Sequence, residues 1–331
     1  MTNDTPGSTI PHSPHESPHE SQHDSPHSAQ RMILGMMRIH SLSDEEIRTL
    51  VDTALQGGIT MFDHADIYGA GREPHECERR FGEAIDLRGS LREQFTLQSK
   101  CGIVRDGPYY DFSRAHILSS VEGSLKALGT DHLDVLLLHR PDALMEPDEV
   151  ASAFDELESS GKVRSFGVSN HTPGQLELLR RSVEQPLQVN QIQLSLAHAA
   201  PIAAGITANM STHGRPSPAE SVVSDLGTLD YCRARDIQVQ AWSPFQGPGG
   251  AFIGDPAYAE LNEALTRIGA HYGATATTVA AAWLLRHPAG IQVVLGTTNP
   301  GRVVEALRAV DVPLTRPEWY ELLRASGQPV P

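Results

Sequence analysis

Residues 43–69, SDEEIRTLVDTALQGGITMFDHADIYG, contain the pattern that decides the fold. Apolar residues recur at helical spacing after Ser43, which forms with Glu46 a capping box typical of a helix start. The Gly-Gly pair that follows indicates the end of this helix. A short apolar run then predicts a strand at 59–63, and polar residues follow it. The segment therefore indicates a helix leading into a buried strand, which is the repeating unit of an α/β protein.

The same alternation continues on both sides of this unit. Amphipathic stretches carry start and stop signals, such as Ser113 before one helix, Gly129 after it, and Thr172 with Pro173 before another. Between them lie short runs rich in Val, Ile and Leu. These runs predict eight strands, near 32–37, 59–63, 95–100, 133–139, 164–169, 187–192, 237–242 and 291–296. After the last strand we expect helices at about 300–309 and 316–325.

Eight strands in this alternation fit either an open doubly wound sheet or a closed barrel. The first strand is not followed by a G-x-G-x-x-G loop, which weakens the case for the dinucleotide-binding open sheet. We therefore predict an α/β fold of the (β/α)8 TIM-barrel type over residues 31–331. In this fold the chemistry gathers at the C-terminal ends of the strands.

Residues 1–30 have a different composition. The stretch PHSPHESPHESQHDSPHS is rich in His, Ser and Pro and nearly lacks aliphatic residues, so it cannot bury enough surface to offset its chain entropy. Five histidines at spacings of three or four could trap a transition metal, but the prolines prevent a helix from aligning them. We expect a disordered tail.

Bulk properties narrow the class of function. The 331 residues are 39% hydrophobic and carry a formal net charge of -15, which argues against binding to nucleic acids or anionic membranes. No run of about 18 apolar residues is present, and the N-terminus lacks the features of a signal peptide. Three cysteines in no metal-ligand spacing fit a reducing compartment. We expect a cytoplasmic protein, and no feature marks a protein partner.

Polar and aromatic residues stand at the predicted ends of the second to seventh strands. A lone residue of this kind is more often solvated or structural, but their convergence on one rim of a barrel favours a functional site. In chain order the candidates are Asp63, Tyr68, Lys100, His139, Ser169, Asn170, Gln191 and Trp242.

The first four of these suit the reduction of a carbonyl group. The carbonyl oxygen must gain a proton as a hydride reaches the carbon, and a free tyrosine, with a pKa of about 10, exchanges protons reluctantly. An ammonium about 4 Å away favours phenolate by up to about 4 kcal/mol, so Lys100 is expected to lower the pKa of Tyr68 by about two units. Asp63 would hold Lys100 in place, and His139 would hydrogen-bond the substrate oxygen.

The motifs FDHADIYG, LQSKCGI, LLLHRPD, GVSN, AWSPF and LGTTNPGR resemble those of the aldo-keto reductase superfamily, and they are most similar to a bacterial branch of oxidoreductases. The resemblance extends from about residue 31 to the C-terminus. It implies a (β/α)8 barrel, NADP(H) as cofactor, a small carbonyl substrate and the tetrad Asp63, Tyr68, Lys100 and His139. It further implies that Ser169, Asn170 and Gln191 hold the nicotinamide carboxamide, with Trp242 against the ring and Ser243 also in contact with the cofactor.

The resemblance places the adenosine end of the cofactor over LGTTNPGRVVEA. The implied contacts are Gly296, Thr297, Thr298, Arg302 and Glu305. A helix N-terminus with a guanidinium suits a 2′-phosphate, although the same residues also fit an ordinary helix cap. Gly296 stands where many relatives have lysine, and Ala306 where many have asparagine, so we expect a moderate preference for NADP(H).

Two other functions fit parts of the pattern. Relatives that serve as potassium-channel β-subunits make a nucleotide-binding redox sensor or partner-binding module the main alternative. A metal-dependent hydrolase is weakly indicated by His64 and Asp66, but Lys100 in their midst would repel a cation, and we expect no metal. Long loops at 197–224 and 246–256 are expected to be mobile and to order over a ligand, but they do not identify the substrate.

Overall fold

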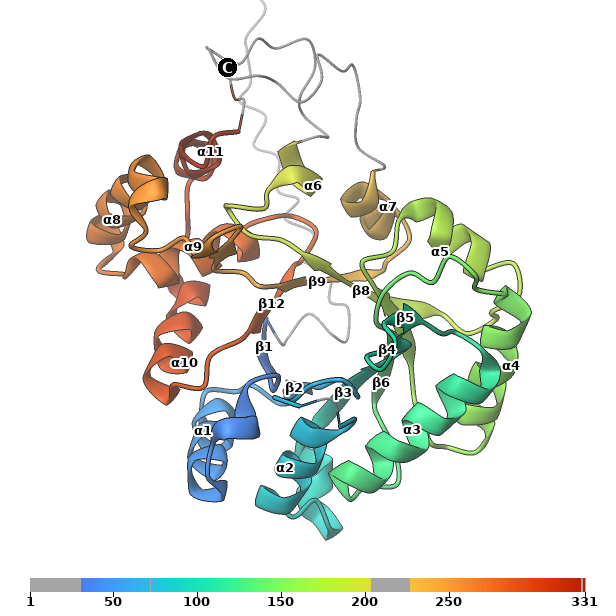
Figure 1. Ribbon diagram of the computed structural model, residues 1–331. Helices are drawn as coiled ribbons and strands as arrows, with labels where there is room; N and C mark the ends of the chain where they lie inside the picture. The colour runs from blue at the N-terminus through green and yellow to red at the C-terminus, as the bar shows by residue number, and fades with distance from the viewer. Residues whose placement is uncertain (1–30, 72, 204–226, 329, 331) are drawn as a thin grey trace, which may run out of the picture.

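The computed structural model describes residues 31–71, 73–203, 227–328 and 330, and it has the predicted closed barrel (Figure 1). The barrel strands pair in parallel in the order β1, β12, β9, β8, β7, β6, β3, β2, and β2 closes the ring on β1. Their bounds are β1 Met32–Gly35, β2 Met61–Asp63, β3 Thr96–Cys101, β6 Val135–Leu138, β7 Phe166–Ser169, β8 Leu187–Gln193, β9 Gln238–Trp242 and β12 Gln292–Leu295. All eight predicted strands are confirmed, each to within about two residues at either end.

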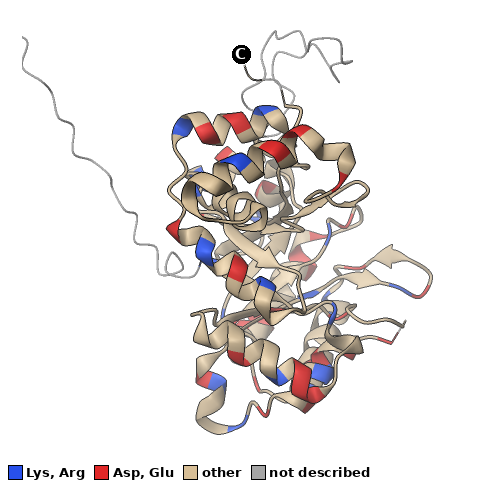
Figure 2. Cartoon of the chain, turned by 90° about the vertical axis from the view of Figure 1, so that its left-hand side faces the viewer, with Lys and Arg blue, Asp and Glu red and all other residues tan. Residues whose placement is uncertain are grey.

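Helices lie outside the strands (Figure 1). They are α1 Asp44–Gln56, α2 Glu76–Ala84, α3 Arg114–Leu128, α4 Pro147–Ser159, α5 Pro173–Leu179, α6 Ala200–Ala203, α7 Thr228–Ala234, α8 Ala259–Tyr272, α9 Ala276–Leu285, α10 Pro300–Leu307 and α11 Arg316–Ala325. Short 3-10 helices are η1 Ile39–Ser41, η2 Gly89–Gln94, η3 Pro256–Tyr258 and η4 Arg308–Asp311. In Figure 2, acidic and basic residues are interspersed along the outer helices.

The start signals act as the sequence predicts. The Ser43 side chain accepts from the backbone of Glu46, and the Glu46 carboxylate accepts from the backbone of Ser43. Thr172 forms the same box with Gln175, and Ser113 caps α3, which ends at Gly129 in the left-handed conformation. Each cap satisfies backbone N–H groups that the first helical turn leaves without a partner.

The core has two parts. Side chains that alternate along a strand point to opposite faces, so one set fills the barrel and the other packs under the helices. The inner apolar cluster consists of Ile33, Met61, Val135, Leu137, Val189 and Val294. Residues two positions further along the same strands, such as Asp63 after Met61 and His139 after Leu137, therefore come toward the C-terminal rim.

Two small hairpins were not predicted. The first pairs β4 Ile103–Val104 with β5 Tyr109–Tyr110, and the second pairs β10 Gln246–Gly247 with β11 Gly250–Ala251. The second hairpin lies in 246–256, which we had expected to be loop, and η3 begins at Pro256, the last residue of that segment. Most of the other predicted loop, 197–224, and the predicted tail, 1–30, lie outside the described residues. No helix of the described chain has both the length and the apolar content that crossing a bilayer requires.

Candidate active site

Three neighbouring strands bring the first four candidates together. Asp63 is the last residue of β2, Lys100 lies near the end of β3, and His139 directly follows β6. Because β3 pairs with both β2 and β6, these side chains meet at one side of the rim. The loop after β2 adds Tyr68. The structure thus brings together the four residues that the sequence nominated.

The Lys100 ammonium is the centre of this group. Its Nζ donates to Asp63 Oδ2 at 2.7 Å, to the His64 carbonyl at 2.8 Å and to Tyr68 Oη at 3.1 Å. The Lys100 side chain is fully buried, and Asp63 is nearly so. Each of the three ammonium hydrogens therefore has an acceptor, which a buried lysine requires.

Burial opposes the effect that we expected of Lys100 on Tyr68. Loss of solvation raises the pKa of Tyr68, the Lys100 charge lowers it, Asp63 raises it again, and the net shift is upward. The expected net lowering is therefore wrong for this structure. The main reason is the burial of the phenol, and the Asp63 carboxylate, which pairs with the same ammonium, also raises the pKa of Tyr68. The pKa of Lys100 is also raised, since Asp63 and Tyr68 together outweigh the effect of burial.

His139 lies edge-on to Tyr68, with ring centroids 5.9 Å apart. Burial lowers the pKa of His139 well below its usual range, and the charges of Lys100 and Arg140 lower it further. The imidazole is therefore neutral at neutral pH. Its Nδ1 is buried and has no hydrogen-bond partner among the described residues, so the hydrogen-bonding capacity of this nitrogen is unused in this structure.

A layer of glutamines inside the barrel supports Asp63. Gln98 Nε2 and Gln191 Nε2 donate to Asp63 Oδ1 at 2.6 and 3.0 Å. Both also donate to Gln240 Oε1, at 2.8 and 3.0 Å. Both carboxylate oxygens of Asp63 thus accept hydrogen bonds. Sequence reasoning missed Gln98 and Gln240, although Gln98 shares the inward face with Lys100 two residues later.

The expected nicotinamide contacts form a chain of hydrogen bonds beside this layer. Ser169 Oγ donates to the Gln191 carbonyl at 2.8 Å, and Asn170 Nδ2 donates to Ser169 Oγ at 2.8 Å. Trp242 Nε1 donates to Asn170 Oδ1 at 2.9 Å, with Asn170 in the left-handed conformation. The Gln191 side chain points toward Asp63. These contacts fix the rings and amides that β7, β8 and β9 present at the rim.

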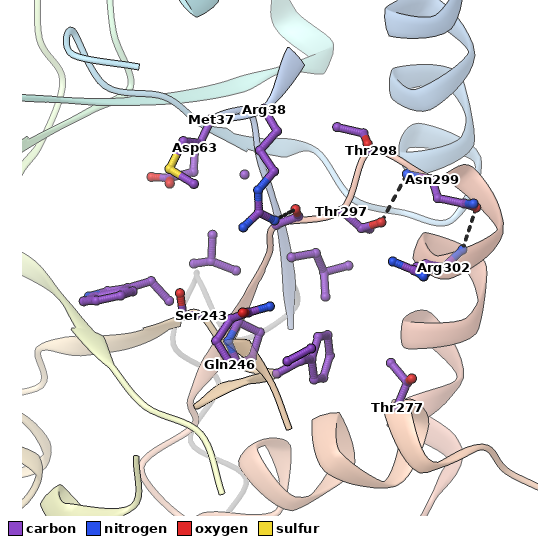
Figure 3. Close-up of a pocket in the computed structure, with 18 of the residues that line it drawn as sticks. Met37, Arg38, Asp63, Ser243, Gln246, Thr277, Thr297, Thr298, Asn299 and Arg302 are labelled. Atoms are coloured by element: carbon purple, nitrogen blue, oxygen red, sulfur yellow. Dashed lines mark hydrogen bonds between the residues drawn. The ribbon is translucent and has the colours of Figure 1, made fainter. Parts of the chain in front are cut away.

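A cavity of about 490 Å³ extends from this cluster to the start of α10 (Figure 3). Asp63, Tyr68, Gln191 and Trp242 line one end. The candidates at and beyond the middle are Ser243, Gly296, Thr297, Thr298 and Arg302. Asn299 caps α10 by accepting from the Arg302 backbone at 3.3 Å.

Lys100, His139, Ser169 and Asn170 lie behind the described lining of the cavity and are not part of it. Among the candidates at α10, Glu305 is placed differently from the rest. It is not among the described residues that line the cavity, and its carboxylate accepts a hydrogen bond from the Thr275 hydroxyl at the start of α9. Sequence reasoning also overlooked lining residues, notably Met37 and Arg38 after β1. The rule that strand ends carry the site applies to β1 as well, and it would have found both.

The cavity fits a nicotinamide dinucleotide. Its lining includes polar groups of the strand ends, such as Asp63, Tyr68 and Gln191, and it reaches the N-terminus of α10 with Arg302. Among the residues that the structure describes, no group of three or more His, Cys, Asp or Glu is arranged to hold a metal ion. His64 is buried with both ring nitrogens unpartnered in the described chain, and burial lowers its pKa to about 4.

The barrel and this rim together define an oxidoreductase of the aldo-keto reductase type. Residues 31–325 match the model of the Aldo/keto reductase family, and the chain belongs to that family. The expected family and fold are confirmed. Members of the family act on small carbonyl compounds and use a nicotinamide cofactor.

Similar proteins cover nearly the whole chain. The 6-dehydroglucose reductase of Agrobacterium fabrum (strain C58) is 38% identical over 303 residues, which span 88% of this chain and 92% of that protein. The uncharacterized oxidoreductase YcsN of Bacillus subtilis (strain 168) is 36% identical over 313 residues, 91% of this chain and 96% of that one. The crystal structure of a putative 2,5-diketo-D-gluconic acid reductase B superposes with a TM-score of 0.67 at 26% identity, covering 89% and 87%.

Proposed function

We propose that this protein is an NADP(H)-dependent reductase that converts an aldehyde or ketone to an alcohol, with Tyr68 as the general acid. The observation that carries the proposal is the buried Lys100 ammonium, which joins Asp63 to the Tyr68 hydroxyl at the end of the cavity. An acid next to a fixed positive charge suits a step in which the acid becomes an anion.

Tyr68 donates its proton to the carbonyl oxygen of the substrate in this proposal. The cofactor, when bound, supplies a hydride to the carbonyl carbon. As the phenol loses its proton, the Lys100 ammonium 3.1 Å away stabilises the phenolate. Asp63 holds the ammonium with a 2.7 Å ion pair, so that it does not need to reorient during the reaction. A proton from solvent then restores Tyr68.

His139 positions the carbonyl group. A neutral imidazole can donate one hydrogen bond without adding a second positive charge beside Lys100. Its low pKa therefore serves the reaction, because a protonated His139 would compete with Lys100 for the oxyanion and repel the ammonium. The edge-on contact with Tyr68, which lines the cavity, keeps the two rings at a fixed angle.

Residues along the whole length of the cavity would hold the cofactor. Ser169, Asn170 and Gln191 would bind the nicotinamide carboxamide, and Trp242 would lie against its ring. Arg302 stands in the first turn of α10, whose free backbone N–H groups already favour an anion. This pairing supports NADPH over NADH, because the two nucleotides differ by one 2′-phosphate.

A single assay tests the proposal. The purified protein, treated with a chelator, should oxidise NADPH when given a reactive aldehyde such as nitrobenzaldehyde. The names of two similar proteins, which refer to a dehydroglucose and a diketogluconic acid, also recommend polyhydroxylated aldehydes and ketones as test substrates. Binding of NADPH without turnover on any of these carbonyls would favour a redox sensor instead. Loss of activity on chelation would indicate a metal-dependent enzyme.

A further inference from the structure

Arg140 stands beside the place where the proposed function puts the substrate carbonyl. It directly follows His139 after β6, and its Cζ lies over the Trp242 ring, 5.3 Å from the ring centroid. Its charge adds to burial in lowering the pKa of His139, and it opposes the rise that burial causes in the pKa of Tyr68. Arg140 is therefore close to three side chains at one corner of the barrel rim.

The Arg140 guanidinium has no anionic partner among the described residues. None of them forms a hydrogen bond or ion pair with its five N–H donors. Neighbouring acids are already engaged, because Asp63 pairs with Lys100 and Asp142 accepts hydrogen bonds from two backbone N–H groups, at 3.0 and 2.8 Å. The contact with the face of Trp242 uses no donor of the guanidinium. This half-buried arginine therefore keeps its full capacity to bind an anion.

The cofactor leaves this corner to the substrate. In the proposed function the dinucleotide occupies the cavity, whose lining includes Tyr68 and Trp242 at the strand ends and Arg302 at α10. The substrate must then bind beyond the Tyr68 and Trp242 end. Arg140 is not among the described lining residues, but it contacts Trp242 at that end. It is thus placed to meet a part of the substrate that the cofactor does not cover.

We infer that Arg140 binds a carboxylate of the substrate, and that the preferred substrates are oxo-acids, in which an aldehyde or ketone and a carboxylate share one small molecule; this inference rests on the proposed function. A carbonyl group held by Tyr68 and His139 brings its substituents to the residue that follows His139. A guanidinium binds both oxygens of a carboxylate at once through two parallel hydrogen bonds. The chain as a whole has a formal net charge of -15, so an anionic substrate needs a local cation of this kind.

Matched pairs of acid and ester measure the effect of the charge alone. 3-Formylbenzoate and 4-formylbenzoate each carry a carboxylate, and their methyl esters have nearly the same shape without the charge. The ester group withdraws electrons from the aldehyde more strongly than the carboxylate does, so intrinsic reactivity favours the ester. For at least one of the two positions we expect the wild-type kcat/KM with NADPH to be about 10- to 100-fold higher for the acid.

Variants of Arg140 assign this preference to one side chain. Arg140→Met keeps most of the length and removes the charge, so the ratio of kcat/KM for acid over ester should fall to about one or below, mainly through the KM of the acid. Arg140→Lys keeps a charge without the planar pair of donors and should retain part of the preference. A general effect of Arg140 on Tyr68 would change acid and ester alike and leave the ratio as in the wild type. Arg324→Met, on helix α11, is the matched control for the loss of one arginine and should leave the ratio unchanged.

Benzoate tests the binding of the carboxylate without its reduction. It should inhibit the wild-type protein competitively against the methyl esters, and Arg140→Met should need about 10- to 100-fold more benzoate for the same inhibition. Melting temperatures within a few degrees of wild type would confirm that the variants are folded. An unchanged ratio in a folded Arg140→Met protein, or a wild type that prefers neither acid to its ester, would overturn the inference and leave the reductase activity in place. If the wild-type protein reduces neither these aldehydes nor nitrobenzaldehyde, the proposed function itself fails.

Discussion

Lys100 shows how a single residue combines a structural and a chemical role. Its ammonium holds the end of β2 through Asp63, holds the following turn through the His64 carbonyl, and contacts the Tyr68 hydroxyl. Spacing along the chain was enough to predict that these residues meet, since strand ends converge in a barrel. The direction in which the pKa of Tyr68 shifts was not predictable from the sequence. It depends on the burial of the phenol and on the opposing charges of Lys100 and Asp63.

The acid is the most direct test at this scale. Tyr68→Phe removes one hydroxyl and keeps the ring that packs at the rim, so NADPH binding should persist. Turnover should fall by about 100-fold or more, since the carbonyl oxygen loses its proposed proton donor. Steady-state kinetics with fluorescence titration of NADPH gives both numbers. Wild-type turnover in this variant would remove Tyr68 from the mechanism.

The role of Lys100 is visible in the pH dependence of the reverse reaction. Alcohol oxidation requires the phenolate of Tyr68 as base. Lys100→Met removes the charge that lowers the pKa of Tyr68, so that pKa should rise further and the rate profile should move to higher pH, with a large loss of rate.

The same change leaves Asp63 as a buried unpaired carboxylate, which is strongly destabilising. Asp63→Asn combined with Lys100→Met removes both charges and separates folding from electrostatics. A pH profile identical to wild type in a folded, active Lys100→Met protein would exclude an electrostatic role for the lysine.

At the scale of elements, the sequence was most informative where signals are local. Capping residues and apolar periodicity located α1, α3, α5 and the eight barrel strands, because each signal acts within a few residues. The hairpins β4–β5 and β10–β11 were missed because strands of two residues have no periodicity to detect. The loop after β1 was missed as part of the site because its contact, Gly296, belongs to the far end of the chain.

The N-terminus of α10 determines the expected choice between NADPH and NADH. Arg302 lies in the first turn of this helix, which Asn299 caps. Charge-assisted hydrogen bonds of this kind contribute about 1.5–3 kcal/mol, so we expect a preference for NADPH of about 10- to 100-fold. Arg302→Ala should weaken NADPH binding by about that factor and leave NADH binding nearly unchanged, as measured by titration followed through tryptophan fluorescence. Equal losses of affinity for both nucleotides would indicate that Arg302 serves only the structure of the helix start.

The whole molecule adds constraints that no local pattern contains. Closure of the barrel brings Gln98 of β3 against Gln240 of β9, and this layer orients Asp63 from within the barrel. These buried amides need partners within the barrel, which Asp63 and the neighbouring glutamines supply, because the barrel interior excludes most water. The sequence therefore predicted which residues face the rim, whereas the network beneath them depends on strand order and register around the ring.

Buried histidines give the whole molecule a predictable response to acid. His64 and His171 are 0% and 2% exposed, and burial lowers the pKa of each to about 4. In the unfolded chain a histidine has a pKa of about 6.5. Between pH 6.5 and 4 the unfolded state therefore binds more protons, and the free energy of unfolding falls as the pH falls. Asp66, whose pKa is raised to about 7 by burial and then by Glu78, acts in the opposite sense over much of this window.

The two histidines outweigh the single aspartate, so we expect the protein to lose stability between pH 7 and pH 5. For His64 alone the loss is about 2 kcal/mol, at about 1.4 kcal/mol for each pH unit below 6.5. His64→Leu should therefore reduce the pH dependence of the unfolding free energy by about this amount, as measured by urea unfolding at both pH values. Phe154→Leu, which alters a buried ring stacked on Phe166 with centroids 4.0 Å apart, is the matched control. It should lower stability about equally at both pH values, because it removes no titrating group. An unchanged pH dependence in His64→Leu would mean that His64 does not enter the folded state as a neutral, buried ring.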